Sequence, residues 1–550
     1  MTSRARCALI ATVAVAAATA EVLALNAYAV REIVWAYPTV FDQLHYTLQS
    51  FRIYHAFGEV GVPRALIAYL SSHSPQGVLV QVQGALVSLA FGPGWLRLLN
   101  VNFLYFVLLQ SITAYVAWYV GGRRVRWALL ALGLTLSLRT PYFWAGGVMD
   151  FRLDFAAFCL YGTLLAVVIR SEVFRSRRWG LVAGLVASLL VWARILTLTY
   201  LTGIVLGLVL YVLLRRRTGW TRQLRNLGLA LCVFVVMVAP VAGLQIEALY
   251  GYYWIGHVAG DEPAIRAQEL GLARIRDHVM FYPRSLLETH LGPAFLVAAV
   301  GMLIASSLAR LVNRTYPEGD GSATTDALVV SALCLIAPIV VLTLDVSKSP
   351  VVVGIATPAA MWLVMLGAMR LAGTREWNGP AGMALALFVL LIGVGHTTRE
   401  LTRHLPLWGD RAQITNMVQA YDRIRQAALQ IGETQPRGVS VFGVSEYLRY
   451  ELAEFFAYDR HRMFLNLTPE LGHTIFAVTL DEARAAIDRS AFVITMSGRR
   501  REDLVYPFDH AIQPLIPTLT DYMRGKCAYL TEFTLRDVRH EIYRCAVPPR

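Results

Sequence analysis

Long apolar segments recur between residues 8 and 396, and they constrain the fold more than any other feature of the chain. Runs of roughly 18 or more apolar residues are long enough to cross the hydrocarbon core of a bilayer. Hydrophobic residues make up 56% of the 550-residue chain, and its mean hydropathy is +0.50. The sequence therefore predicts a polytopic α-helical membrane protein.

Eleven segments are expected to span the membrane. The N-terminal segment has the positive head and apolar body of a signal peptide, but its apolar part is longer than a typical signal sequence. We therefore expect a retained first helix from Ala8 to Val30. The other ten expected spans are Leu98–Val120, Trp127–Pro141, Phe151–Ile169, Gly180–Trp192, Ile195–Leu214, Leu227–Leu249, Leu291–Leu311, Leu328–Leu344, Val351–Leu371 and Ala381–His396.

Two segments that follow the first span are expected to lie in the membrane interface. The segment Asp42–Phe57 is half polar, and Val78–Phe91 is short for a span and is interrupted by Gln81 and Gln83. Such segments suit helices that lie along the bilayer surface.

The arginines fix the expected orientation. They cluster in the short loops 121–126, 170–178 and 215–225, and in the pairs 310/314 and 370/375. If Val78–Phe91 does not cross, all these clusters fall on the cytoplasmic side with the N-terminus, and the C-terminus lies outside. This pattern accounts for the net charge of +13 without a nucleic acid partner. Only two of the 50 basic residues, Lys348 and Lys526, are lysines, which points to a GC-rich bacterial genome.

The chain beyond residue 397 has a different character. Helix-like stretches alternate there with short strand-like ones, and about 150 residues can form one core. We expect a membrane module at residues 1–397 and an extracytoplasmic α/β domain at residues 398–550. Cys527 and Cys545 lie in this domain and can pair if it is extracytoplasmic. The six cysteines show no metal-binding spacing.

The segment Tyr37–Phe57 carries the first candidate for chemistry. Asp42 follows the first span directly, and His45 and Tyr46 come within one helical turn of it. A carboxylate in this position is often only solvated, but beside a membrane-bound substrate it can act as a general base.

A second group of charges lies at two other outer helix ends. Asp150 and Asp154 are four residues apart and share a face if helical, with Arg152 between them and Arg194 at the outer end of another span. Ionisable groups at membrane depth face a cavity or a partner. We expect structural pairing with Arg194, a role in function, or both.

Two further features are open to two interpretations each. Lys348 lies at an outer helix mouth, where it can bind a phosphate or extend toward the interface as a simple membrane anchor. The loop Tyr250–His290 begins with aromatic residues, and Asp261 with Pro263 marks a helix start. It is either a shelf for an acceptor or a capped surface helix.

The combined pattern resembles the GT-C superfamily of polyprenyl-phosphate-sugar glycosyltransferases, above all its protein O-mannosyltransferase and lipid A aminoarabinose transferase branch. The sequence FDQLHY stands where that branch has an acidic pair followed by Tyr, and here the pair is Asp42-Gln43. The segment SKSPVVVGIATPAA is similar to the branch's Lys-x-Pro…Pro pattern, with Pro350, Pro358 and, in place of a frequent Tyr, Val351.

The resemblance implies roles for the candidate residues. Asp42 is the expected catalytic base or acceptor-orienting acid, supported by Asp150 or Asp154, while Lys348 with Arg152 or Arg194 neutralises the lipid phosphate that leaves. His45 and Tyr46 are expected to bind substrate. Some relatives use a divalent metal, although the acids here are few and scattered.

The sequence therefore predicts an inverting glycosyltransferase of the bacterial inner membrane. It would move a sugar from a polyprenyl phosphate to a lipid, glycan or protein acceptor on the outer face, in contact with membrane lipids. One alternative is a transporter or flippase of lipid-linked sugars, although no internal repeat is visible. Another is a membrane-anchored binding or assembly protein whose outer domain acts on its own.

Overall fold

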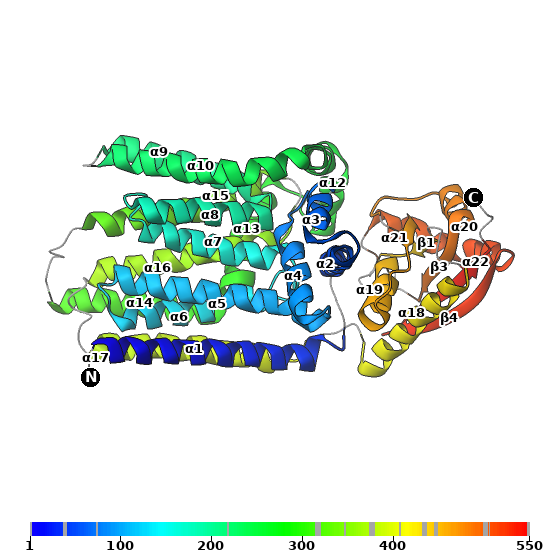
Figure 1. Cartoon of the computed structure of the whole chain (residues 1–550), viewed down its shortest axis with the longest axis horizontal. Coiled ribbons are helices and arrows are strands. Elements are labelled where there is room, and N and C mark those ends of the chain that lie inside the picture. Colours follow the sequence, from blue (N-terminus) through cyan, green and yellow to red (C-terminus); the bar gives the residue numbers. More distant parts are fainter. Residues whose placement is uncertain are drawn as a thin grey trace.

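The computed structural model describes residues 3–36, 41–72, 75–216, 219–313, 321–345, 348–372, 380–405, 409–431, 437–444, 449–472, 474–498, 504 and 506–546. Within these ranges it forms a bundle of long helices and a smaller α/β unit at one end of the bundle (Figure 1). We call this end of the bundle the tail-facing end and the α/β unit the tail domain.

Among the described residues, eight helical segments are long and apolar enough to cross a membrane. Two of these segments contain more than one helix: α13 (Ile275–Ser285) and the π-helix η4 (Leu286–Leu291) lead into α14, and the 3-10 helix η5 (Val352–Ala356) leads into α16. The helices of these segments are α5 (Trp95–Val120), α7 (Leu153–Arg170), α9 (Thr197–Arg215), α10 (Trp220–Leu244), α14 (Gly292–Asn313), α15 (Gly321–Leu344), α16 (Thr357–Ala372) and α17 (Pro380–Thr402).

The three other expected spans are helices as well. They are α1 (Ser3–Tyr28), α6 (Val125–Ser137) and α8 (Arg177–Ala193), and they lie alongside the eight in the bundle (Figure 1). The last two have only 13 and 17 residues. Close backbone packing holds α6 in place, because a Cβ on Gly133 would lie 2.7 Å from the backbone of Leu390 in α17. The chain is thus a multi-pass membrane protein.

The two expected interfacial segments lie at the tail-facing end of the bundle. They are α2 (Phe41–Val60) and α4 (Leu79–Phe91), joined through the short α3 (Val62–Leu70). Helix α2 lies across the end of the bundle, between the spans and the tail domain (Figure 1). The loop that follows α10 also lies at this end, with a π-helix, η3 (Tyr250–Ala259), and α12 (Glu262–Glu269), which begins next to Asp261 and Pro263 as expected.

The tail domain has the expected α/β composition. Its five-stranded sheet has the order β2-β1-β3-β5-β4, with β1 (Arg437–Phe442) parallel to β2 (Leu467–Leu471) and β3 (Ser490–Ser497). The antiparallel strands β4 (Cys527–Leu535) and β5 (Val538–Cys545) complete it, and a disulfide joins Cys527 to Cys545. Its helices are α18 (Arg411–Ile431), α19 (Tyr450–His461), α20 (Leu480–Arg489), α21 (Pro507–Ile512) and α22 (Ile516–Arg524).

Buried aromatic side chains join the tail domain to α2. Phe51 of α2 is fully buried and stacks on Tyr458 and Phe455 of α19, with ring centroids 4.9 and 6.2 Å apart. Trp95, at the start of α5, contacts the Phe455 ring edge-on. Burying one such side chain contributes roughly 1.5–3 kcal/mol. Helix α2 is therefore held between the bundle and the tail domain.

Candidate active site

A short turn before α7 organises the charged residues at the tail-facing end. The side-chain amide of Asn102, on α5, donates to the carbonyls of Val148 and Asp150 at 3.2 and 2.8 Å. The Gly146 N–H donates to Asp150 Oδ2 at 2.7 Å. These bonds close the turn and leave Asp150 only 1% exposed.

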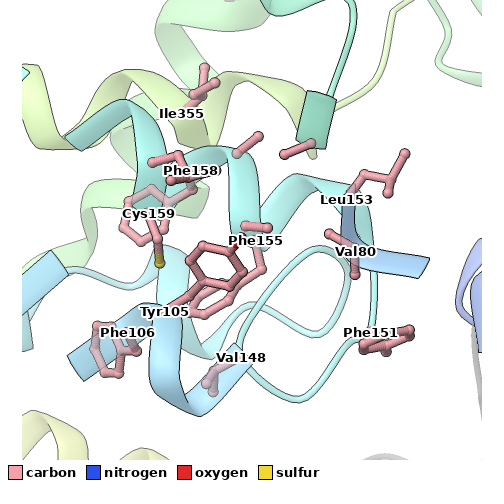
Figure 2. Close-up of a cluster of buried hydrophobic side chains, with 14 of the residues drawn as sticks. Val80, Tyr105, Phe106, Val148, Phe151, Leu153, Phe155, Phe158, Cys159 and Ile355 are labelled. Atoms are coloured by element: carbon pink, nitrogen blue, oxygen red, sulfur yellow. The ribbon is translucent and has the colours of Figure 1, made fainter. Parts of the chain in front are cut away.

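Apolar side chains fix the segment that leaves this turn. Phe151, Leu153 and Phe155 are each fully buried, in a cluster with side chains of α4 and α5 (Figure 2). Arg152 and Asp154 alternate with them and are partly exposed. The alternation directs both charged side chains to the opposite side, where they line a cavity.

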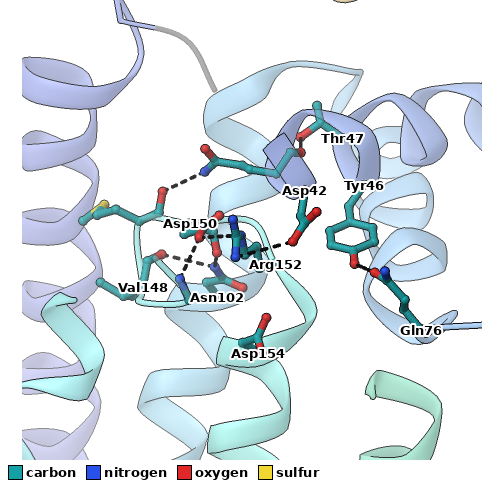
Figure 3. A network of polar contacts seen from close by, with 12 residues as sticks. Asp42, Tyr46, Thr47, Gln76, Asn102, Val148, Asp150, Arg152 and Asp154 are labelled. Carbon is teal, nitrogen blue, oxygen red and sulfur yellow. Dashed lines mark hydrogen bonds and ion pairs between the residues drawn. The ribbon is translucent and has the colours of Figure 1, made fainter. Parts of the chain in front are cut away.

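Arg152 lies between two carboxylates (Figure 3). Its Nε is 3.0 Å from Asp150 Oδ2, and its Nη1 is 3.5 Å from Asp42 Oδ2. Burial raises the pKa of Asp150 to about 7, against the lowering effect of Arg152 and the Gly146 N–H. Burial acts to lower the pKa of Arg152, but Asp150 and Asp42 outweigh it, so that its pKa is raised. Arg152 is therefore a permanent cation between a buried acid and an exposed one.

Helix α2 brings Asp42 to this cation. Asp42 lies in its first turn, and 51% of the side chain is exposed. The neighbouring Gln43 is buried, and its Nε2 donates to the Met149 carbonyl at 3.0 Å. A carboxylate cannot donate this bond, which gives a physical reason for Gln rather than an acid at position 43. The amide ties α2 to the turn and so sets the position of Asp42.

The expected pairing of Asp154 with Arg194 is confirmed. Asp154 lies in the first turn of α7, Arg194 ends α8, and Arg194 Nη1 is 2.9 Å from Asp154 Oδ1. The ion pair links α7 to α8 at one side of the cavity. Each arginine has five N–H donors, and these ion pairs occupy only Nη1 of Arg194 and two nitrogens of Arg152. Both retain donors for an anion.

Tyr46 and His45 are not among the residues that line the cavity. Tyr46 is 3% exposed, and its hydroxyl donates to Gln76 Oε1. Gln76 Nε2 in turn donates to the Tyr252 hydroxyl at 2.6 Å. His45 Nδ1 lies 3.3 Å from Glu451 of the tail domain. These contacts connect α2 to Gln76 on one side and to the tail domain on the other.

Lys348 is buried and bonded to the backbone. It is 2% exposed, and its Nζ donates to the carbonyls of Leu342 and Thr343 at 2.8 Å each, and to that of Asp345. The ammonium group also lies 5.1 Å from the centre of the Tyr282 ring. Lys348 thus caps the end of α15 and holds the following segment, of which Ser349, Val351 and Val352 line the cavity.

The cavity has a volume of about 400 Å³ and lies where the bundle, α2 and the tail domain meet. Of the eight residues singled out in the sequence, Asp42, Arg152, Asp154 and Arg194 line it. Sequence reasoning missed Gln76, Arg266 and Asp345 as lining residues, since none lies in a recognisable motif. Tyr252 and Tyr253 also line it, and they belong to the aromatic stretch noted after residue 250.

No metal site is evident in the part of the chain that the structure describes. No group of three or more His, Cys, Asp or Glu side chains there is arranged to hold a metal ion. Asp42 and Asp154 each face an arginine instead. The described ligand set does not fit a divalent metal, so we derive no step through one.

No protein-family model and no curated protein sequence matches the chain. Its structure is similar to that of ArnT from Cupriavidus metallidurans. The apo structure of ArnT is 14% identical with a TM-score of 0.55, and the structure bound to undecaprenyl phosphate is 13% identical with a TM-score of 0.58. Both comparisons cover 100% of both chains. The chain thus shares the fold of these structures, and the expected polytopic helical fold with a C-terminal α/β domain is confirmed.

Proposed function

We propose that this protein is an inverting glycosyltransferase that moves a sugar from a polyprenyl phosphate to an acceptor hydroxyl or amine. The observation that carries the proposal is the exposed Asp42 carboxylate beside two guanidinium groups, Arg152 and Arg194, in one cavity. A solved structure with the same fold holds undecaprenyl phosphate, which supports a lipid phosphate as one substrate.

The reaction needs a base and a cation, and the cavity offers both. Asp42 would take the proton from the acceptor, whose oxygen or nitrogen attacks the anomeric carbon from the face opposite the phosphate. The bond between the anomeric carbon and the phosphate oxygen breaks, and the phosphate keeps the electron pair. Arg152 and Arg194 would stabilise the negative charge that develops there. Attack from the opposite face inverts the anomeric centre.

The other candidate residues would act through these groups. Asp150 would position Arg152, and Asp154 would position Arg194, through their ion pairs. Lys348 would hold the segment Ser349–Val352 in the cavity wall rather than touch the phosphate. His45 and Tyr46 would hold α2 so that Asp42 faces the cavity.

We place the cavity on the outer face of a bacterial inner membrane, with residues 1–397 as the membrane module and 398–550 as the outer domain. The arginine clusters support this orientation, and the disulfide of the tail domain supports it independently, because disulfides persist in oxidising compartments. A phosphatase that is active only in the periplasm, fused after Arg550, should be active. A silent fusion, with a cytoplasmic reporter active in its place, would reverse the orientation.

The function is tested with membranes that carry the wild-type protein, incubated with a panel of radiolabelled polyprenyl-phosphate pentoses and hexoses. The expected result is transfer of label from at least one donor. Transfer of intact donor across the bilayer without cleavage would instead establish a transporter or flippase. The panel also identifies the sugar, and extraction of the products separates lipid, glycan and protein acceptors.

A further inference from the structure

Two close helix contacts leave a groove between them in the membrane bundle. A Cβ on Gly184 of α8 would lie 2.4 Å from the carbonyl oxygen of Ala230 in α10, and a Cβ on Gly207 of α9 would lie 2.7 Å from Leu333 in α15. Helix α8 is thus packed on α10 and α9 on α15. A groove of about 230 Å³ remains between these pairs, and side chains of all four helices and of α7 line it.

The groove is apolar and open at the side of the bundle. Leu206 of α9 lines it and is 65% exposed. Among the described residues that line it, the hydroxyl groups belong to Tyr161 and Thr202, and both already donate to backbone carbonyls, at 2.6 and 2.9 Å. An unpaired polar group of a ligand would be costly in such surroundings. The groove therefore suits a hydrocarbon chain.

A turn with unusual backbone angles brings an arginine to one end of the groove. This is the end of the bundle opposite the tail domain, and we call it the far end. Residues 172–174, between α7 and α8, have φ values of +52° to +66°, which side chains with a Cβ rarely adopt. Asn226 of α10 holds the turn, since its Nδ2 donates to the carbonyls of Phe174 and Arg175 at 2.7 and 3.1 Å. Phe174 lines the groove, and Arg175 follows it directly.

Arg175 meets a second arginine, Arg215, at a buried carboxylate. Asp326, near the start of α15, is 4% exposed, and its oxygens lie 3.6 Å from Arg175 Nη2 and 3.7 Å from Arg215 Nη1. The Tyr211 hydroxyl also donates to Asp326, at 2.5 Å. Val330, one turn further along α15, lines the groove. One carboxylate does not neutralise two guanidinium groups, and each of these has five N–H donors. The arginine pair therefore presents cationic donors at the far end.

The segments around this arginine pair are also basic. The loops 170–178 and 215–225 carry four and five arginines, respectively, and between them a single acid, Glu172. On the orientation proposed above, both loops lie on the cytoplasmic side. Clusters of arginine beside membrane helices attract the headgroups of anionic lipids. Guanidinium groups also bind phosphate oxygens through paired hydrogen bonds.

We propose that the groove and the pair Arg175–Arg215 form a binding site for an anionic phospholipid of the cytoplasmic leaflet. One acyl chain lies in the groove, and the two arginines bind the phosphate of the headgroup. The lipid fills the space that the helix pairs leave open. This site shares no lining residue with the cavity at the tail-facing end, and it does not depend on the proposed function.

The test measures lipid binding to the purified full-length protein by native mass spectrometry. The probes are dioleoylphosphatidylglycerol and dioleoylphosphatidylcholine, which have the same chains and differ in net charge. The wild type should bind phosphatidylglycerol at least tenfold more tightly. Arg175→Gln and Arg215→Gln should each weaken its binding about fivefold, as expected for the loss of one basic residue near an anionic lipid. Arg310→Gln, at an exposed position of the far end outside the groove, is the matched control.

A second pair of variants tests the place of the acyl chain. Leu206→Trp narrows the groove from its exposed edge and should weaken binding of phosphatidylglycerol at least fivefold. Leu391→Trp, on α17, is the control, because Leu391 is 69% exposed and does not line the groove. It should bind the lipid like the wild type.

Each outcome decides. Equal affinity for the two lipids, or arginine and groove variants that bind like their controls, would overturn the inference. Displacement of the lipid by an equal concentration of inorganic phosphate would mean an anion site without a lipid, and displacement by a lower concentration of polyprenyl phosphate would assign the groove to that lipid instead. Either result also overturns the inference. If Arg175→Gln does not fold, the result for Arg215→Gln decides, since the Arg215 side chain is more exposed.

Discussion

The ion pair between Arg152 and Asp150 gives the sharpest prediction for stability. Only 11% of the Arg152 side chain and 2% of the Asp150 side chain are exposed, and the closest atoms are 3.0 Å apart. Removing one partner of a buried pair leaves the other charge without compensation, which costs about 3–5 kcal/mol. Arg152→Met should therefore lower the free energy of unfolding by about that amount at pH 8.

The loss should shrink at lower pH. The pKa of Asp150 is about 7 even with Arg152 beside it, and without that cation it rises further. At pH 6 the orphaned carboxyl is protonated, and the loss relative to wild type shrinks by about 1.4 kcal/mol for each pH unit between the raised pKa of the variant and the wild-type value of about 7. The assay is unfolding by SDS in mixed micelles at pH 6 and pH 8. The double variant Arg152→Met/Asp150→Asn should recover most of the loss at pH 8.

Arg489→Met is the matched control. Arg489 lies 2.7 Å from Glu470 in the tail domain, but half of its side chain is exposed, so its loss should cost less than about 1 kcal/mol. If both variants lose the same free energy, or if the loss at Arg152 is the same at the two pH values, Arg152 does not compensate the buried Asp150 carboxylate as we describe.

Three further substitutions test individual contacts. The Asp150→Asn variant should become more stable relative to the wild type as the pH rises from 5 to 8. The reason is that the folded wild type retains a proton on Asp150 that the unfolded chain releases near pH 4. A difference in thermal midpoint that stays constant over this pH range would contradict the raised pKa. Gln43→Glu should destabilise the protein by about 1–3 kcal/mol in chemical unfolding, since it replaces the donor to the Met149 carbonyl by an acceptor. Gln426→Glu, at an exposed position, is the control. Lys348→Met should lower kcat and leave the KM for the donor within about threefold, because the Nζ of Lys348 contacts backbone carbonyls and not the cavity. A KM raised tenfold or more would instead make Lys348 a phosphate ligand.

The sequence was sufficient to predict the membrane bundle and the composition of the tail domain. Apolar runs indicated the spans, and the segment Val78–Phe91, which was expected to lie in the interface, forms the helix α4 at the tail-facing end of the bundle. The pairing of Asp154 with Arg194 was also foreseen, because two charges at apolar helix ends need a partner. These inferences depend on local pattern and on the properties of a bilayer.

Contacts between segments that are distant in the sequence could not be predicted from the sequence alone. Nothing near Lys348 in the sequence reveals that its ammonium group folds back onto the end of α15. The burial of Asp150 depends on Asn102, which is 48 residues away in the chain. Thr474 and Tyr506 line the cavity only because the tail domain packs on α2 through Phe51. No local sequence pattern predicts that packing. Such features appear only when distant segments are packed together.

The role of Asp42 is the central claim, and one measurement tests it most directly. Purified wild-type protein, Asp42→Asn and the exposed tail-domain control Asp521→Asn are compared for sugar transfer and for binding of polyprenyl phosphate. Loss of a general base typically slows a reaction about 10²–10⁴-fold. We predict that Asp42→Asn binds polyprenyl phosphate like the wild type and transfers sugar at least 100-fold more slowly, while Asp521→Asn is unchanged in both. Transfer by Asp42→Asn at the wild-type rate would contradict the account.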